Sequence, residues 1–266
     1  MKNIRSLLNI LNKKTGVPFE KKISGIVASF TPKEQIIFFI FAVFLFAGTI
    51  GLLLKVNQSL LVKVPVRGGS MVEGVVGTPR FINPILAISD ADRDLTTLVY
   101  SGLMRASDNG ILKTELAESF NVSEDGLIYT FILKEGLVWH DGKEVTADDV
   151  VFTIKKAQDS TLRSPQRASW DGVLVEKISD MKVQFTLKQQ YAPFLENTTI
   201  GILPKHLWKN IDSEQFGFSK YNVEPIGTGP YKVEKIKKDD AGIPKYYNLT
   251  SFKKFTTGEP YINNIK

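Results

Sequence analysis

Nineteen consecutive residues without a charge, from Ile36 to Leu54, constrain this chain more than any other feature of its sequence. In a helix rising 1.5 Å per residue, about 20 apolar residues cross a hydrocarbon core of roughly 30 Å. A buried helix of a soluble domain usually has a polar face, which this segment lacks. A cleaved signal peptide has a shorter apolar region, of about 7–15 residues, and then a small-residue cleavage site. The sequence therefore predicts an uncleaved transmembrane helix over residues 35–55, with the lipid bilayer as its partner.

The basic residues of the chain are concentrated before this helix. Residues 1–35 carry seven Lys or Arg and two Glu, whereas residues 56–266 carry 26 basic and 26 acidic residues. Because basic residues mark the cytoplasmic side of membrane helices, residues 1–34 are expected to form a cytosolic tail, and the main domain is expected to be extracytoplasmic. The tail can form a membrane-surface helix or a solvated segment. A neutral main domain lacks the basic footprint of nucleic-acid binding, so no nucleic acid is expected as a partner.

After a linker over residues 56–67, the pattern is typical of an α/β domain over residues 68–266. Alternating apolar residues predict half-buried strands, and capping residues followed by apolar residues at helical spacing predict helices. Leu103 is expected to share a helix face with Leu95, Leu98 and Val99. The expected strands are 71–76, 127–133, 182–188, 231–236 and 246–252, and the expected helices open at Asp90, Thr146 and Pro204.

Catalytic and metal-binding patterns are missing from the sequence. There is no Cys and there are only two His, so a structural zinc site is not expected. His140 and Asp141 are adjacent at a turn and would point in different directions, so His140 is expected to be a turn residue. Residues 90–101 lack the Gly and the Glu of a calcium loop. The sequence therefore predicts a binding protein without metal or cofactor, not an enzyme.

A series of segments resembles the family 5 extracellular solute-binding proteins, which include the oligopeptide- and dipeptide-binding receptors of ABC importers. They occur in the order of the family. The segments are 77–84 (GTPRFINP), 98–103 (LVYSGL), 116–120 (LAESF), 123–136 (SEDGLIYTFILKEG), 139–142 (WHDG), 146–152 (TADDVVF), 191–194 (YAPF), 202–208 (ILPKHLW) and 227–231 (GTGPY).

This resemblance implies an α/β fold of the two-lobed periplasmic-binding-protein type II, with a peptide or similar small solute held between the lobes and passed to ABC permease subunits. Family members continue into a second lobe beyond the position of Lys266, so the chain looks like the N-terminal portion of such a receptor. The retained membrane helix departs from the family, in which a lipidated cysteine or a cleaved signal is usual.

The ligand-binding candidates are residues of loops and irregular segments, where a cleft between lobes would be lined. Gly227 and Gly229 are expected to allow backbone conformations that other residues do not adopt. Two functions stay open: a receptor for import, or a tethered sensor or scaffold that uses the same fold without transport. The candidates are Arg80, Phe81, Asn83, Ser89, Asp90, Arg167, Trp170, Gly227 and Thr228.

Overall fold

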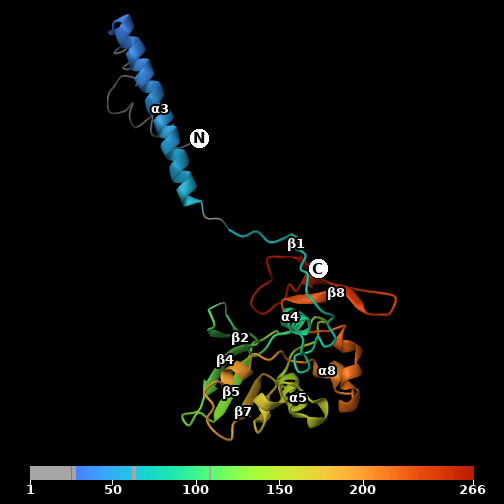
Figure 1. The fold of residues 1–266 in the computed structure, drawn as a ribbon. Helices are drawn as coiled ribbons and strands as arrows, with labels where there is room; N and C mark the ends of the chain where they lie inside the picture. Colours follow the sequence, from blue (N-terminus) through green and yellow to red (C-terminus); the bar gives the residue numbers. More distant parts are fainter. Residues whose placement is uncertain (1–24, 26–27, 62–63, 108) are drawn as a thin grey trace. The chain divides into compact units, whose positions relative to one another are not determined.

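The computed structural model describes residues 25, 28–61, 64–107 and 109–266 (Figure 1). The chain divides into two compact units, Met1–Val64 and Pro65–Lys266, and each is described by itself. The tail expected over residues 1–34 falls mainly on residues outside the described part of the chain.

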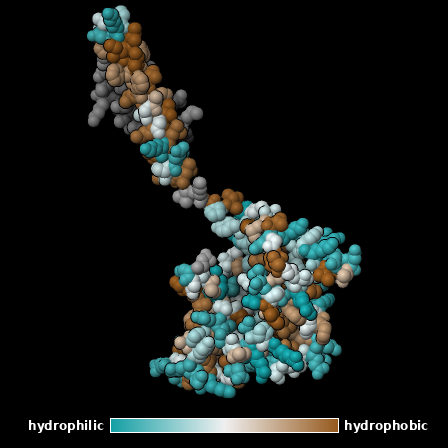
Figure 2. Space-filling model, viewed as in Figure 1, coloured by the Kyte–Doolittle hydropathy of each residue, from teal (hydrophilic) through white to brown (hydrophobic). Residues whose placement is uncertain are grey.

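The first unit contains the helix α3, Pro32–Leu60. It begins at Pro32, three residues before the expected start at residue 35, and the Glu34 carboxylate accepts 2.8 Å hydrogen bonds from the amide and hydroxyl of Thr31 at this end. Its apolar side chains are exposed along its length (Figure 2). The helix is long and apolar enough to cross a membrane, which makes it a candidate anchor. It continues to Leu60, beyond the expected end at residue 55, so the first part of the expected linker is helical.

The second unit combines three sheets with short helices (Figure 1). Its strands are β1 (Ser70–Met71), β2 (Met104–Ala106), β3 (Leu112–Thr114), β4 (Ala117–Val122), β5 (Ile128–Leu133), β6 (Leu174–Ser179), β7 (Lys182–Thr186), β8 (Tyr231–Lys238), β9 (Pro244–Ser251) and β10 (Asn264–Ile265). Its helices are α4 (Asp90–Val99), η1 (Ser160–Leu162), α5 (Ala147–Gln158), α6 (Arg167–Trp170), α7 (Phe194–Asn197), α8 (Lys205–Trp208), η2 (Ser213–Phe218) and η3 (Lys220–Asn222).

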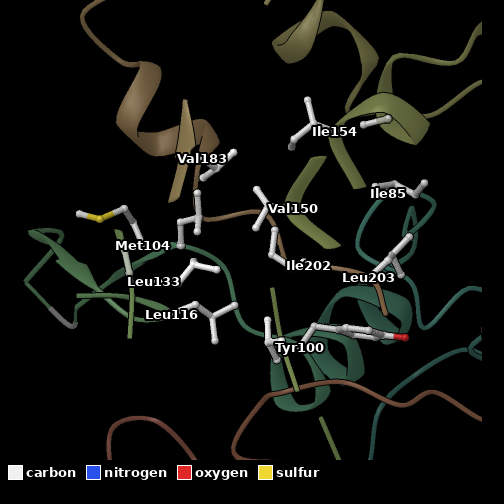
Figure 3. Packing of buried hydrophobic residues seen from close by; sticks show 14 of the residues in the cluster. Ile85, Tyr100, Met104, Leu116, Leu133, Val150, Ile154, Val183, Ile202 and Leu203 are labelled. Carbon is white, nitrogen blue, oxygen red and sulfur yellow. The ribbon is translucent and has the colours of Figure 1, made fainter. Parts of the chain in front are cut away.

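One four-stranded sheet, called sheet C here, has the order β4-β5-β7-β6 and is antiparallel throughout. Tyr129, Phe131 and Leu133 of β5 are buried, as the alternating pattern predicts. Helix α5 contacts β6 and β7 of this sheet. Figure 3 shows Val150 and Ile154 of α5 among the other core side chains.

The other four-stranded sheet, called sheet A here, has the order β1-β10-β9-β8. The hairpin of β8 and β9 supplies most of it, and the two-residue strand β1 pairs in parallel with β10 at its edge. Helix α4 contacts β8, and Figure 1 shows α4 between sheet A and the rest of the unit. Sheets A and C thus form two regions joined through the segments around α4.

Three local expectations are wrong. The strand expected over residues 71–76 ends at Met71, because β10 offers only two residues for pairing. Helix α4 ends at Val99, so Leu103 is buried in the following segment and not on the helix. Asp90 does not cap α4: Ser89 is the cap, and Asp92 completes the reciprocal pair of hydrogen bonds.

Candidate functional site

The start of α4 is tied to residues 80 and 81 by the buried carboxylate of Asp92. One oxygen accepts hydrogen bonds from the backbone amides of Arg80 (2.7 Å) and Phe81 (2.8 Å), and the other accepts one from the amide of Ser89 (3.2 Å). Burial alone would raise the pKa of Asp92, but the hydrogen bonds from Phe81, Ser89 and Arg80 outweigh it and lower the pKa. Asp92 therefore stays ionised and fixes the backbone of this loop.

Four of the sequence candidates come together here. The Arg80 guanidinium lies 5.7 Å from the centre of the Phe81 ring, and the Arg80 side chain is exposed. The Ser89 hydroxyl accepts a hydrogen bond from the Asp92 amide at 3.1 Å. Asp90, at the first position of the helix, is exposed. This end of α4 presents a cation and a carboxylate to solvent, with a half-buried aromatic ring beside them.

Asn83, by contrast, is completely buried. Its amide nitrogen donates to the side-chain oxygen of Asn222 at 3.0 Å, and its own side-chain oxygen accepts from the Ile85 amide at 3.1 Å. Asn222 in turn donates to the Phe216 carbonyl at 2.8 Å. A buried amide with these partners holds two loops together, since a buried polar group needs hydrogen bonds.

Gly227 and Thr228 lie at the opposite end of α4. A Cβ atom at Gly227 would be 1.9 Å from the Val99 carbonyl oxygen, so this position needs glycine because the two backbones touch. The expectation of an unusual backbone conformation is wrong, because neither Gly227 nor Gly229 has a positive φ. Thr228 is buried, and its hydroxyl has no hydrogen-bond partner.

His140 binds the same loop and lies in a turn, as predicted. Its Nδ1 accepts from the Gly227 amide at 3.3 Å, and its Nε2 lies 3.1 Å from the Gly229 carbonyl oxygen. Only a neutral ring protonated at Nε2 satisfies both contacts. Burial lowers the pKa of His140 to about 4, which keeps the ring neutral.

Arg167 and Trp170 lie elsewhere, on α6. The Trp170 indole is 1% exposed, and its ring centre lies 5.7 Å from those of Phe185 and Phe194. It is therefore part of the sheet C core, whereas the Arg167 side chain is exposed. Ligand contact by the nine sequence candidates stays a prediction. The structure separates them into four at the start of α4, the buried Asn83, two in the 227–228 loop and two on α6.

Glu115 is a buried carboxylate that the sequence did not single out. Burial raises its pKa to about 7, and hydrogen bonds from Gly102 and Ser101 and the charges of Arg105 and Lys134 oppose this. Thr256 joins the cluster from the far side, because its hydroxyl donates to the Glu115 carbonyl and accepts from the Lys134 ammonium, each at 3.0 Å. No local signal marks Glu115, because its partners are distant in the sequence.

Two hollows lie near these residues. One, of about 250 Å³, separates α4 from sheet A and is lined by apolar side chains that include Leu95, Leu98 and Leu249. Another, of about 740 Å³, lies beside His140 and the β8–β9 hairpin. Neither is lined by any of the nine candidates.

The described residues carry their acidic and histidine side chains at scattered positions. They contain no cluster of three or more His, Cys, Asp or Glu side chains that could hold a metal ion. Asp141 pairs with His206 (2.7 Å) and not with its neighbour His140. The arrangement holds a backbone in place and offers polar groups for binding.

Residues 112–266 match the family model for bacterial extracellular solute-binding proteins, family 5. The oligopeptide-binding protein AppA of Bacillus subtilis is 32% identical over 205 residues, which cover 76% of this chain and 37% of AppA. The dipeptide-binding protein of Escherichia coli is 31% identical, over 70% of this chain and 40% of its own length. The chain thus spans about two fifths of the length of these relatives.

Solved structures agree with the sequence relatives. The structure of B. subtilis AppA in complex with a nonapeptide has a TM-score of 0.70 at 32% identity and covers 76% of this chain and 40% of AppA. The ABC transporter substrate-binding protein CtaP of Listeria monocytogenes has a TM-score of 0.66 at 38% identity, over 75% of this chain and 40% of CtaP. The expected α/β fold of the periplasmic binding proteins is thereby confirmed.

Proposed function

Because this chain belongs to the bacterial extracellular solute-binding proteins of family 5, we propose that it is a membrane-anchored receptor that binds peptides and delivers them to an ABC permease. The observation that carries the proposal is the match to peptide-binding relatives over three quarters of the chain, together with the shared fold. The same relatives are binding proteins, which supports a receptor and not an enzyme.

The anchor in this proposal is α3. It is the one helix of the described residues that is long and apolar enough to span a membrane. The excess of basic residues before it supports a cytoplasmic N-terminus, and the family supports an extracytoplasmic domain.

We place the ligand-contacting groups of this chain at the exposed start of α4. Arg80 offers a cation for a peptide carboxylate, Asp90 offers an anion for an amine, and the Phe81 ring offers an apolar face. Asn83, Trp170 and Thr228 act in this scheme as buried supports of the loops.

Calorimetric titration of the full chain in detergent with peptides of two to nine residues tests binding. This chain alone is expected to bind no more tightly than about 1 mM, and a version extended by the second lobe of the relatives at least a hundredfold more tightly. In that longer version, Arg80→Ala should weaken binding about tenfold. The matched control Lys209→Ala, which removes an exposed cation far from α4, should not change it. Hydrolysis of the peptides, seen by mass spectrometry, would contradict a receptor role.

Topology is tested by reporter fusions. A reporter that is active only outside the cytoplasm should give a signal when fused after Lys266 and none when fused after Phe30. The opposite pattern would overturn the orientation, and a mature chain beginning near Val56 would overturn the uncleaved anchor.

A further inference from the structure

The outer face of sheet A carries a row of lysine side chains. Lys232, Lys235 and Lys237 of β8 pair in register with Thr250, Asn248 and Tyr246 of β9. Residues directly opposite one another share a face, and alternate residues of β9 do the same. The three lysines therefore lie on one face, away from the buried side chains of Tyr247 and Leu249.

Other groups extend this basic face. The Lys266 ammonium lies 4.3 Å from the centre of the Tyr246 ring, which places a fourth cation beside the row. Lys235 and Lys237 are exposed, as are Lys253 and Lys254 just after β9, whereas Lys232 is half-buried beside His140. None of the ion pairs found among the described residues involves the three lysines of the row.

The positive charge is local to this hairpin. Residues 231–254 contain seven Lys and three acidic residues, a net charge of +4, within a domain (56–266) whose charges cancel. Asp239, one of the three acidic residues, already accepts hydrogen bonds from the amides of Ala241 (3.0 Å) and Ile243 (2.8 Å) in the turn. The rest of the domain is correspondingly acidic, so its charge is strongly asymmetric.

We propose that this face, Lys232, Lys235 and Lys237 with Tyr246, is a docking surface for anionic lipid headgroups of the membrane in which α3 is anchored. The inference rests on the anchor of the proposed function and adds a second, electrostatic contact to it. A lysine close to a membrane surface is attracted by anionic lipids, and each such lysine strengthens binding about fivefold. Tyr246 supplies the aromatic group that favours the headgroup region.

Chain length makes this contact possible. Nine residues, 61–69, separate the end of α3 from β1. Extended, they reach at most about 30 Å, a length that allows contact between the domain and the membrane surface. A short tether gives an effective concentration in the millimolar range, at which a weak surface contact becomes populated.

The test uses the full chain in lipid nanodiscs, which contain either phosphatidylcholine alone or a mixture with phosphatidylglycerol. The chain has no Cys, so Ala241→Cys at the hairpin tip gives a single site for a fluorescent donor, and a labelled lipid serves as the acceptor. We expect more energy transfer on anionic discs at low salt and a loss of the difference at about 0.5 M salt.

The triple variant Lys232→Gln/Lys235→Gln/Lys237→Gln should lower the ratio of docked to free domain about a hundredfold on anionic discs. The control Lys113→Gln/Lys188→Gln/Lys209→Gln removes the same charge from exposed positions outside sheet A and should leave the ratio unchanged. Equal transfer on both disc types, or an equal loss in both triple variants, would overturn the docking surface. Failure of the anchor is a separate result, because the chain would then not enter the discs.

Discussion

Sheet C and sheet A differ in how completely their cores are filled. Sheet C packs against α5, and the rings of Trp170, Phe185 and Phe194 contact one another at its centre. Sheet A has a two-residue edge strand and a hollow of about 250 Å³ between itself and α4. Val72 and Val76, next to that edge, are 76% and 98% exposed. The difference indicates that sheet C is stabilised by segments close to it in the sequence, such as α5, whereas sheet A leaves apolar surface exposed at its edge.

The largest expected effect compares the two cores directly. Phe185→Ala should lower the free energy of unfolding by about 3–5 kcal/mol, because the packed aromatic cluster cannot collapse around the cavity. Leu249→Ala in sheet A should cost only about 2 kcal/mol, the low end for such a change, because Leu249 already lines a hollow. Urea unfolding followed by tryptophan fluorescence measures the free energy of unfolding of both variants. The control Leu174→Ala, at a 55% exposed residue of β6, should change this free energy by less than about 0.5 kcal/mol. Equal costs at Phe185 and Leu249 would refute the difference in packing.

The second prediction concerns acid and the contact between the regions at His140. The pKa of this ring is about 4 in the folded chain and 6.5 in the unfolded chain, so the unfolded chain binds the proton first as pH falls. Its contribution to stability is present above pH 6.5 and should decline by about 3 kcal/mol as pH falls to 4. The proton would also break the hydrogen bond from the Gly227 amide. NMR titration of the two histidines checks this, and a pKa near 6.5 for His140 would contradict it.

A third prediction tests the contact of sheet A with α4. Gly227→Ala should destabilise the chain by about 2 kcal/mol, because the added methyl group meets the Val99 backbone and either the loop or the end of α4 must shift. Gly74→Ala is the matched control, since a Cβ there meets nothing within 4 Å. It should change the thermal midpoint by little, and a similar loss in both variants would show that the close contact is unimportant.

A fourth prediction concerns Glu115, where the regions meet through Thr256. Its folded pKa of about 7 lies above the ordinary value of 4.5, so the buried group favours folding fully below pH 4.5 and loses that contribution as pH rises through 7. Glu115→Gln should therefore raise the free energy of unfolding by about 3 kcal/mol at pH 8, where the unfolded chain has lost the proton, and by almost nothing at pH 4. Chemical unfolding at the two pH values tests this, and destabilisation at pH 8 would mean that the charge itself binds a partner.

Sequence patterns predicted the parts of the fold that depend on neighbours along the chain. The alternation of β5 and β7 and the capping box of Thr146 and Asp149 are confirmed, because each needs only a few adjacent residues. The strand expected over 71–76 is wrong because pairing depends on a partner 194 residues away in the sequence, since Met71 pairs with Ile265. Apolar alternation alone could not show that the partner is so short.

The candidate site was predictable to a smaller extent. Its loops could be located from the family motifs, but the role of Asp92 in gathering Arg80, Phe81 and Ser89 follows only from the folded backbone. Trp170 was a candidate because a tryptophan side chain can stack on a ligand. In the folded unit it is buried against Phe185 and Phe194. Burial and long-range pairing are properties of the whole unit and leave no local trace.

The loop of residues 227–229 has a consequence for recombining this chain with its relatives. It touches Val99 before sheet C and His140 within the sheet C region, yet it leads into sheet A. A hybrid that joins one parent's residues 104–226 to another parent's flanks would therefore mix partners across this junction. Hybrids should tolerate exchange best when the positions of Val99, His140 and Gly227 come from one parent. These three positions therefore show which segments must be exchanged together, and they do so better than the boundaries of the sheets.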